Sequence, residues 1–210
     1  MSSSTPRTIH DILTPALVLE MNAAEFNLAT MASILEESNS HLRAHVKNHK
    51  SPGLARLQIA SGSQGVTCAT VREAAAMIKE GITDILIANE VVGGPKIARL
   101  VELLRQGGQI CIAIDDEANA HDISKAVVNS GMQVSAVVDL EIGMGRCGTA
   151  CDKAIDLALF IDRLPGLQFV GIMAYEGHVG LIDDPDKREA ECRRALGEAV
   201  ETKRLIEAAG

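Results

Sequence analysis

Short hydrophobic runs alternate with longer amphipathic segments along the chain. The runs lie at 42–47, 66–69, 85–88, 110–114, 135–141 and 168–174. Each run is followed by a segment whose apolar residues recur at helical spacing. The runs at 85–88 and 110–114 are apolar throughout, which is typical of parallel strands covered on both faces. The pattern therefore predicts six strand–helix units of an α/β fold with a parallel sheet.

Residues that favour helix ends fall between the predicted strands. Thr70 and Glu73 have the spacing of a capping box, and Asp184 before Pro185 predicts the start of the last helix. An earlier helix, after a short extended segment, is predicted to be capped by Asn22. These boundaries agree with the strand positions and support the same strand–helix alternation.

Six parallel strands fit two architectures, because periodicity does not distinguish a doubly wound sheet from part of an eight-stranded barrel. Residues 1–13 are expected to form a flexible arm, and residues 14–210 a single α/β domain. In both architectures ligands bind at the carboxyl ends of the strands, so residues directly after each run are candidates for a site. These candidates are Lys47, Cys68, Thr70, Asn89, Glu90, Asp115, Asp116, Gly143 to Arg146, and Tyr175 to His178.

Composition and charge exclude several classes of function. The chain has 210 residues, 47% of them hydrophobic and 2% aromatic, and a net charge of -8. It offers neither a basic patch nor a row of stacking rings, so no nucleic-acid partner is expected. No apolar run reaches the length of a membrane span, and the first residues lack the apolar stretch of a signal peptide. The sequence therefore predicts a cytoplasmic protein without a membrane partner.

The five cysteines are expected to be thiols in that compartment. Cys147 and Cys151 are the only close pair. Without a second pair or a nearby histidine they indicate zinc only weakly, and packing near a strand-to-helix turn is the favoured interpretation. We therefore predict no metal ligands in this chain.

The segment 42–50 carries the residue with the clearest chemical potential. Its apolar run ends on Lys47, which lies between His45 and His49. At the end of a buried strand, desolvation favours the neutral amine, and a neutral amine is the nucleophile of Schiff-base chemistry. The alternative, that Lys47 and Lys50 are surface charges on a loop, fits the local sequence equally well.

Two further side chains have a functional and a purely structural interpretation. His45 titrates near neutral pH, which suits proton transfer, but it could equally be a strand histidine bonded to a backbone carbonyl. Tyr175 is the only tyrosine, and it lies where a flat ring could face a planar ligand or simply extend into water. The local sequence leaves both alternatives open.

Three motifs resemble the fold-type III pyridoxal-phosphate enzymes. They are His45-Val-Lys47, Gly143-Met-Gly-Arg-Cys-Gly148 and Gly171-Ile-Met-Ala-Tyr-Glu-Gly-His178. Within these enzymes the chain is most similar to the group of D-threonine aldolase, 3-hydroxy-D-aspartate aldolase and D-serine dehydratase, over residues 14–210. The resemblance implies a TIM-type eight-stranded barrel like the alanine racemase N-terminal domain, followed by a mostly β domain. On this basis the barrel is C-terminally truncated after about six units, the second domain is absent, and the full-length form is a homodimer.

The resemblance also implies roles for individual residues. Lys47 corresponds to the lysine that binds pyridoxal 5'-phosphate covalently, and Arg146 to the cation near the phenolic oxygen of the ring. Tyr175 corresponds to the side chain that stacks on the pyridine face, and His45 lies within reach for proton handling. Weaker candidates for the substrate pocket are His178, Asn89 and Cys68.

The reaction implied by the resemblance is a lyase reaction on β-hydroxy D-amino acids, with cleavage to glycine and an aldehyde. The alternative within the group is dehydration of D-serine or 3-hydroxyaspartate with release of ammonia. The resemblance implies that a divalent metal assists both the cleavage and the dehydration. The ligands of this metal are expected outside this chain. A chain of this extent is therefore expected to bind the cofactor weakly and to cleave little substrate.

Two other classes of protein are disfavoured. A non-catalytic pyridoxal-phosphate-binding barrel needs eight strands and its own phosphate loop, whereas six strands are predicted here. A dinucleotide-binding domain needs a Gly-x-Gly-x-x-Gly motif at the start of a helix after an early strand, and the chain has none.

Overall fold

The computed structural model describes residues 8–210, which divide into two compact units between Ser40 and His41. The first unit contains a short 3-10 helix, η1 (Ile9–Asp11), and the helix α1 (Met21–Glu36). Residues 16–20, predicted from the sequence as a short extended segment, form neither a helix nor a strand. Most of the predicted arm, residues 1–7, lies outside the described residues.

Glu20 is the residue that caps α1, so the prediction that Asn22 caps this helix was wrong. The two carboxylate oxygens of Glu20 accept hydrogen bonds from the backbone N–H groups of Asn22 and Ala23. A carboxylate at this position satisfies two free amides at once and also opposes the positive end of the helix dipole. Asn22 therefore lies inside the first turn.

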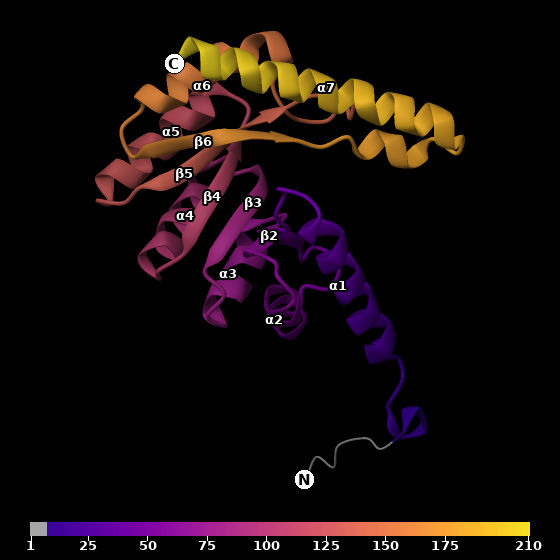
Figure 1. The fold of residues 1–210 in the computed structure, drawn as a ribbon. Coiled ribbons are helices and arrows are strands. Elements are labelled where there is room, and N and C mark those ends of the chain that lie inside the picture. The colour runs from indigo at the N-terminus through magenta and orange to yellow at the C-terminus, as the bar shows by residue number, and fades with distance from the viewer. Residues whose placement is uncertain (1–7) are drawn as a thin grey trace. The chain divides into compact units, whose positions relative to one another are not determined.

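The second unit contains six parallel strands that are hydrogen-bonded in the order of the sequence (Figure 1). The strands are β1 (Ala44–His45), β2 (Val66–Cys68), β3 (Asp84–Glu90), β4 (Gln109–Ile114), β5 (Val134–Leu140) and β6 (Leu167–Ala174). The other elements are α2 (Pro52–Ala60), α3 (Val71–Lys79), α4 (Gly94–Arg105), α5 (Glu117–Asn129), α6 (Cys151–Arg163), η2 (Gly177–Leu181) and α7 (Pro185–Ala209). All six predicted strands are confirmed.

The strand order decides between the two predicted architectures. In a doubly wound sheet the order reverses at a switch point, whereas in a barrel each strand lies beside the next one in sequence. Here the order is sequential from β1 to β6, and no pairing between β6 and β1 closes the sheet within the described residues. The unit is therefore an incomplete barrel, as predicted.

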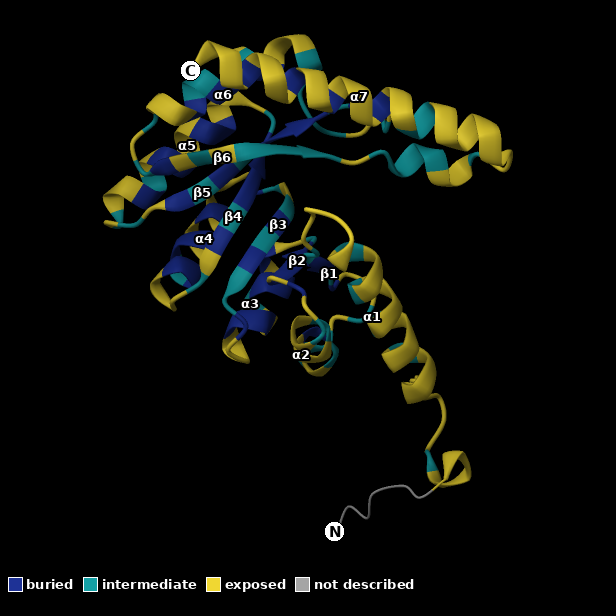
Figure 2. Cartoon of the chain, viewed as in Figure 1, coloured by how far each residue is buried: buried dark blue, intermediate teal, exposed yellow. Residues whose placement is uncertain are grey.

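The core lies between the strands and the helices that follow them (Figure 2). In β3, Ile85 and Ile87 are fully buried, whereas Leu86 and Ala88 are only partly buried. Successive strand residues point to opposite faces, so one face of the sheet packs against the helices and the other is more open. No helix in the described part of the chain has both the length and the apolar character needed to cross a membrane.

The last helix covers the far edge of the sheet. Asp184 caps α7 through its side chain and Pro185 is the first helical residue, as predicted. One stripe of α7 is buried, and the helix contacts α6 and β6. The stripe consists of Ala195, Ala199, Thr202 and Ile206. This packing fixes α7 beside α6 and β6.

Candidate active site

A tight turn after β1 carries Lys47. The turn begins at Val46, whose N–H donates to the carbonyl of Thr67 in β2 at 2.9 Å, and it closes where the N–H of Lys50 donates to the carbonyl of Val46 at 2.8 Å. Because β1 ends at His45, Lys47 lies in the turn and is exposed. Of the two interpretations that the sequence left open, the structure supports the exposed position in a loop, since the strand stops two residues before Lys47.

Lys47 and Tyr175 meet although their strands are at opposite edges of the sheet. The Nζ atom of Lys47 lies over the ring of Tyr175, 5.7 Å from its centroid. Tyr175 follows β6 directly, so the curvature of the sheet brings the carboxyl ends of β1 and β6 towards each other. The ring is 51% exposed, which leaves a flat aromatic surface open beside a primary amine. Such a pair has the geometry of a cation–π contact.

His45 lies beneath the same turn. Its Nδ1 atom accepts a hydrogen bond from the backbone N–H of Lys47 at 3.2 Å, so a neutral His45 carries its proton on Nε2. Partial burial and the nearby charge of Lys47 lower the pKa of His45, against the charge of Glu73 and a hydrogen bond to the backbone of Thr67, which both raise it. The imidazole is therefore neutral at pH 7, with an N–H available at Nε2.

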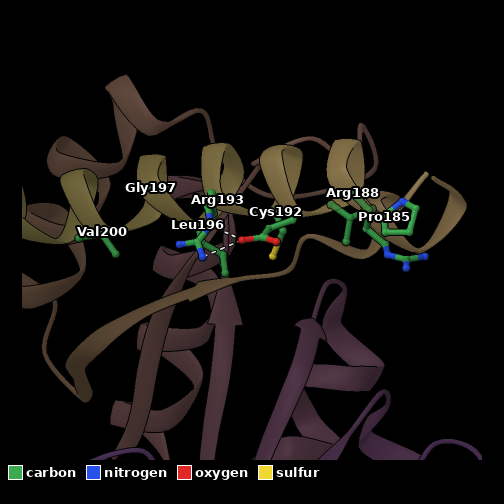
Figure 3. Close-up of a pocket in the computed structure, with 9 residues that line it drawn as sticks. Pro185, Arg188, Cys192, Arg193, Leu196, Gly197 and Val200 are labelled. Atoms are coloured by element: carbon green, nitrogen blue, oxygen red, sulfur yellow. Dashed lines mark hydrogen bonds and ion pairs between the residues drawn. The ribbon is translucent and has the colours of Figure 1, made fainter. Parts of the chain in front are cut away.

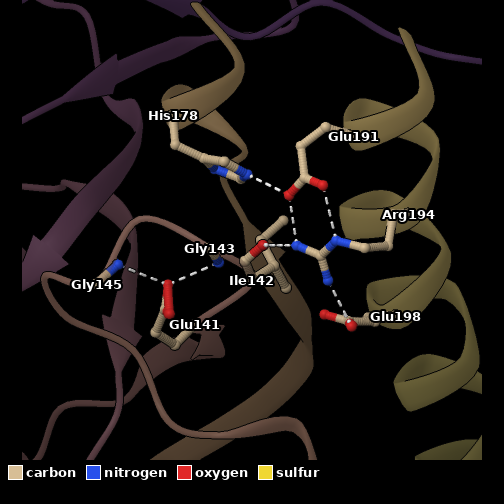
Figure 4. Close-up of polar contacts among 8 residues, drawn as sticks. All are labelled: Glu141, Ile142, Gly143, Gly145, His178, Glu191, Arg194 and Glu198. Carbon is tan, nitrogen blue, oxygen red and sulfur yellow. Dashed lines mark hydrogen bonds and ion pairs between the residues drawn. The ribbon is translucent and has the colours of Figure 1, made fainter. Parts of the chain in front are cut away.

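The glycine-rich loop after β5 presents Arg146. One carboxylate oxygen of Glu141 accepts hydrogen bonds from the N–H groups of Gly143 and Gly145, each at 2.8 Å (Figure 4). These bonds, first from Gly145 and then from Gly143, lower the pKa of Glu141. Gly143 and Gly145 have φ values of 133° and 61°, a region that favours glycine. The loop is therefore a fixed turn, and Arg146 extends from it into solvent.

His178 connects this loop to α7 (Figure 4). Its Nε2 atom lies 2.9 Å from a carboxylate oxygen of Glu191, and a Cβ atom on Gly143 would lie only 2.4 Å from its ring. Arg194 bonds both Glu191 and, at 3.3 Å, the carbonyl of Ile142. His178 is thus held between the loop and the helix.

Two carboxyl groups and a thiol, buried or partly buried, lie together near the ends of β3 and β5. Glu90, Asp139 and Cys147 each offer one ligand atom, and these atoms lie within 4.8 Å of one another. Asp139 is 5% exposed. Its burial, followed by the hydrogen bond with Glu90, raises the pKa of Asp139 to about 7. Asp139 therefore keeps its proton over most of the acidic range, up to about neutral pH.

These three residues are a possible metal site, whereas the sequence analysis predicted no metal ligands. Burial raises the pKa of the Cys147 thiol, which donates to Asp139 at 3.6 Å, whereas a metal binds the thiolate. One carboxylate oxygen of Glu90 is buried without a hydrogen-bond partner among the described residues. Asp139 was missed by the sequence analysis. A single acid at position 139 within an apolar strand was the available indication.

The other predicted pocket residues lie in different environments. Asn89 is exposed, and its side-chain amide donates to the carbonyl of Ala69 at 3.1 Å, which joins the ends of β3 and β2. Cys68 is fully buried in the core, where burial raises the pKa of its thiol to about 12. The structure thus gathers Lys47, His45 and Tyr175, and it keeps Cys68 away from the open surface.

A separate groove runs along α7 (Figure 3). Its volume is about 730 Å³, and Leu196, Val200 and Cys192 are among the residues that line it. None of the predicted site residues lines this groove. It is therefore distinct from the strand-end residues described above.

Comparisons with known proteins agree with this architecture. Residues 19–209 match the family model described as alanine racemase, N-terminal domain. D-threonine aldolase of an Arthrobacter species is 38% identical over 199 residues, which are 94% of this chain and 52% of that protein. The 3-hydroxy-D-aspartate aldolase of Paracoccus denitrificans (strain Pd 1222) is 35% identical over 95% of this chain and 52% of its own.

A solved structure has a similar sequence identity and covers a similar share of this chain. The crystal structure of D-threonine aldolase from Filomicrobium marinum superposes with a TM-score of 0.93 and 37% identity, covering 96% of this chain and 55% of that one. The chain thus spans about half the length of the relatives that it matches. With the sequential parallel strands and the family match over nearly all of its length, the chain belongs to the alanine racemase N-terminal domain family.

Proposed function

We propose that the protein to which this chain belongs is a pyridoxal-phosphate-dependent lyase that cleaves β-hydroxy D-amino acids to glycine and an aldehyde. The observation that carries this proposal is the exposed amine of Lys47 over the open face of Tyr175. The names of the aldolases that share 35% and 38% identity with the chain support the substrate class.

The residues present fit the cofactor. A planar aromatic aldehyde needs a primary amine for covalent attachment and a flat surface for stacking, and Lys47 and Tyr175 provide the two side by side. When bound, pyridoxal 5'-phosphate withdraws electrons from Cα of an attached amino acid. We assign Lys47 to covalent attachment, Tyr175 to stacking and Arg146 to the phenolic oxygen.

In this proposal His45 handles a proton near the amine, and Glu141 positions the loop that carries Arg146. Neutral His45 holds a proton at Nε2 and can exchange it with a group above the turn. Glu141 fixes the loop that carries Arg146. In this proposal the permanent positive charge of Arg146 serves the phenolic oxygen. His178 and Asn89 remain our candidates for the substrate side of the pocket.

The wider proposal follows the family and the sequence. We propose a D-amino acid substrate, a divalent metal held by residues outside this chain, a homodimer and a cytoplasmic location. The five cysteines are free thiols in the structure, which is compatible with that compartment. Dehydration with release of ammonia is the alternative outcome of the same site.

Borohydride trapping tests the attachment site. The purified chain is incubated with pyridoxal 5'-phosphate, reduced and mapped by peptide mass spectrometry. The label is expected on Lys47, and Lys47→Ala is expected to abolish it without unfolding the chain. Lys125→Ala, at an exposed position of α5, is the matched control and retains the label. A dominant label on Lys50 in the wild-type chain would overturn the assignment.

A further inference from the structure

Glu73 is a buried carboxylate next to the turn that carries Lys47. It occupies the first turn of α3 and is 8% exposed. An acid at this depth needs a partner for each oxygen. Its Oε2 atom accepts a hydrogen bond from the N–H of Ala69 at 2.7 Å, and its Oε1 atom lies 3.1 Å from the ammonium group of Lys50. Both partners belong to segments at the carboxyl ends of the strands.

The bond to Ala69 departs from the predicted capping box. Thr70 does cap α3, since its hydroxyl accepts from the N–H of Glu73 at 3.2 Å. The carboxylate of Glu73, however, accepts from the N–H of Ala69 rather than from that of Thr70. Because Asn89 bonds the carbonyl of the same Ala69, the peptide after β2 is held from two sides. Glu73 is therefore bonded to a backbone segment that Asn89 also holds.

Lys50 connects Glu73 to the turn of residues 46–50. It is the only described residue other than glycine with a positive φ, 51°, a conformation that is unfavourable for a lysine. Its N–H closes the turn on the carbonyl of Val46, and its side chain ends on Glu73. The ion pair thus holds the last residue of the turn in place, three residues after Lys47.

The charge of Glu73 also acts on the neighbours of Lys47. Burial alone would raise the pKa of Glu73, but the N–H of Ala69 and the charge of Lys50 outweigh it and lower the pKa. The carboxylate is therefore ionised at neutral pH. It acts electrostatically on His45, whose ring bonds the N–H of Lys47.

We propose that Glu73 is the positioning residue for Lys47. Through Lys50 it fixes the turn of residues 46–50, so that the amine of Lys47 is directed over Tyr175. This inference rests on the proposed function of Lys47, but its structural part concerns the ligand-free chain. Two measurements on one set of variants separate the structural part from the function.

The variants are Glu73→Gln, which keeps an acceptor for Ala69 but loses the charge, and Lys50→Met, which leaves the Glu73–Ala69 bond intact. The matched control is Asp84→Asn. It removes another partly buried ion pair, the 2.7 Å contact of Asp84 with Arg43, without touching the turn. Lys50→Met also serves as the second test if Glu73→Gln fails to fold.

The first measurement is site-resolved amide hydrogen exchange of the ligand-free chain. Glu73→Gln and Lys50→Met are expected to accelerate exchange at the N–H of Lys50, and Asp84→Asn is expected to leave it unchanged relative to global unfolding. The second is the rate of trapping pyridoxal 5'-phosphate on Lys47 with borohydride. Both turn variants are expected to slow it about fivefold, equivalent to roughly 1 kcal/mol, and the double variant no further than either single one.

The outcomes are distinguishable. Wild-type exchange and trapping rates in a folded Glu73→Gln variant would overturn the positioning role, and so would additive effects in the double variant. If the wild-type chain forms no adduct on Lys47, the proposed function fails. The exchange of the Lys50 amide then still decides whether Glu73 fixes the turn.

Discussion

Tyr175 and His178 lie three residues apart after β6, but their side chains have different surroundings. The ring of Tyr175 is half exposed beside Lys47, whereas His178 is held by Glu191 and packed against Gly143. We therefore expect Tyr175→Ala to weaken retention of pyridoxal 5'-phosphate about fivefold, because an aromatic stacking contact is worth roughly 1 kcal/mol. His178→Ala should have a smaller effect. An absorbance titration measures both, with Tyr175→Phe as the control that keeps the ring, and equal loss in the two alanine variants would contradict the stacking role.

Asp139 makes stability depend on pH. Its pKa in the folded chain is raised to about 7 from 3.8, so the folded state binds a proton that the unfolded state releases between these values. This contribution therefore falls as the pH rises from about 4 to about 7. We therefore expect the free energy of unfolding of Asp139→Asn, relative to that of the wild type, to be higher at pH 8 than at pH 5. Urea denaturation at the two pH values measures this, and a constant difference between variant and wild type would count against a raised pKa of Asp139.

At the scale of elements, the loop after β5 depends on a glycine whose replacement destabilises the fold. Gly143 has a φ of 133°, and its Cα packs against His178. Gly143→Ala should lower the free energy of unfolding by roughly 1 to 3 kcal/mol, because backbone strain and the clash act together. Gly197→Ala is the matched control. It lies within α7 with open space around it, so it should stabilise by up to about 1 kcal/mol. Urea denaturation compares the two, and equal effects would show that Gly143 is not constrained.

The other helix ends show how local chemistry selects a boundary. Asp184 and Thr70 cap their helices as predicted, because a side-chain acceptor directly precedes the helical residues. At α1, Glu20 outcompetes Asn22 since its two oxygens reach two amides. A glutamate is a less usual cap than asparagine, so residue preference alone selected the wrong position.

At the scale of the whole molecule, the sheet is open at both ends within the described residues. β1 and β6 each have one strand neighbour. Unpaired parallel edges favour association, and the chain spans about half of its relatives. We expect the 210-residue chain to bind pyridoxal 5'-phosphate weakly and to show negligible cleavage of D-threonine or D-3-hydroxyaspartate with a divalent metal. The assay quantifies glycine and aldehyde, and ammonia for the dehydratase alternative. Robust turnover by this chain would contradict the prediction.

The sequence by itself determined the six strands and the edge of the sheet where the candidate residues gather. Apolar runs and caps are local properties, and the carboxyl ends of parallel strands share one edge in any arrangement. Only the tertiary structure decided the strand order, because periodicity carries no information about neighbours. It also placed Lys47 over Tyr175, since that contact depends on the curvature of the whole sheet, and it decided between the buried and the exposed position of this lysine, which the local pattern had left open. The contact between Glu90 and Asp139 and the ion pair of Lys50 with Glu73 arise in the same way, from residues distant in sequence that packing brings together.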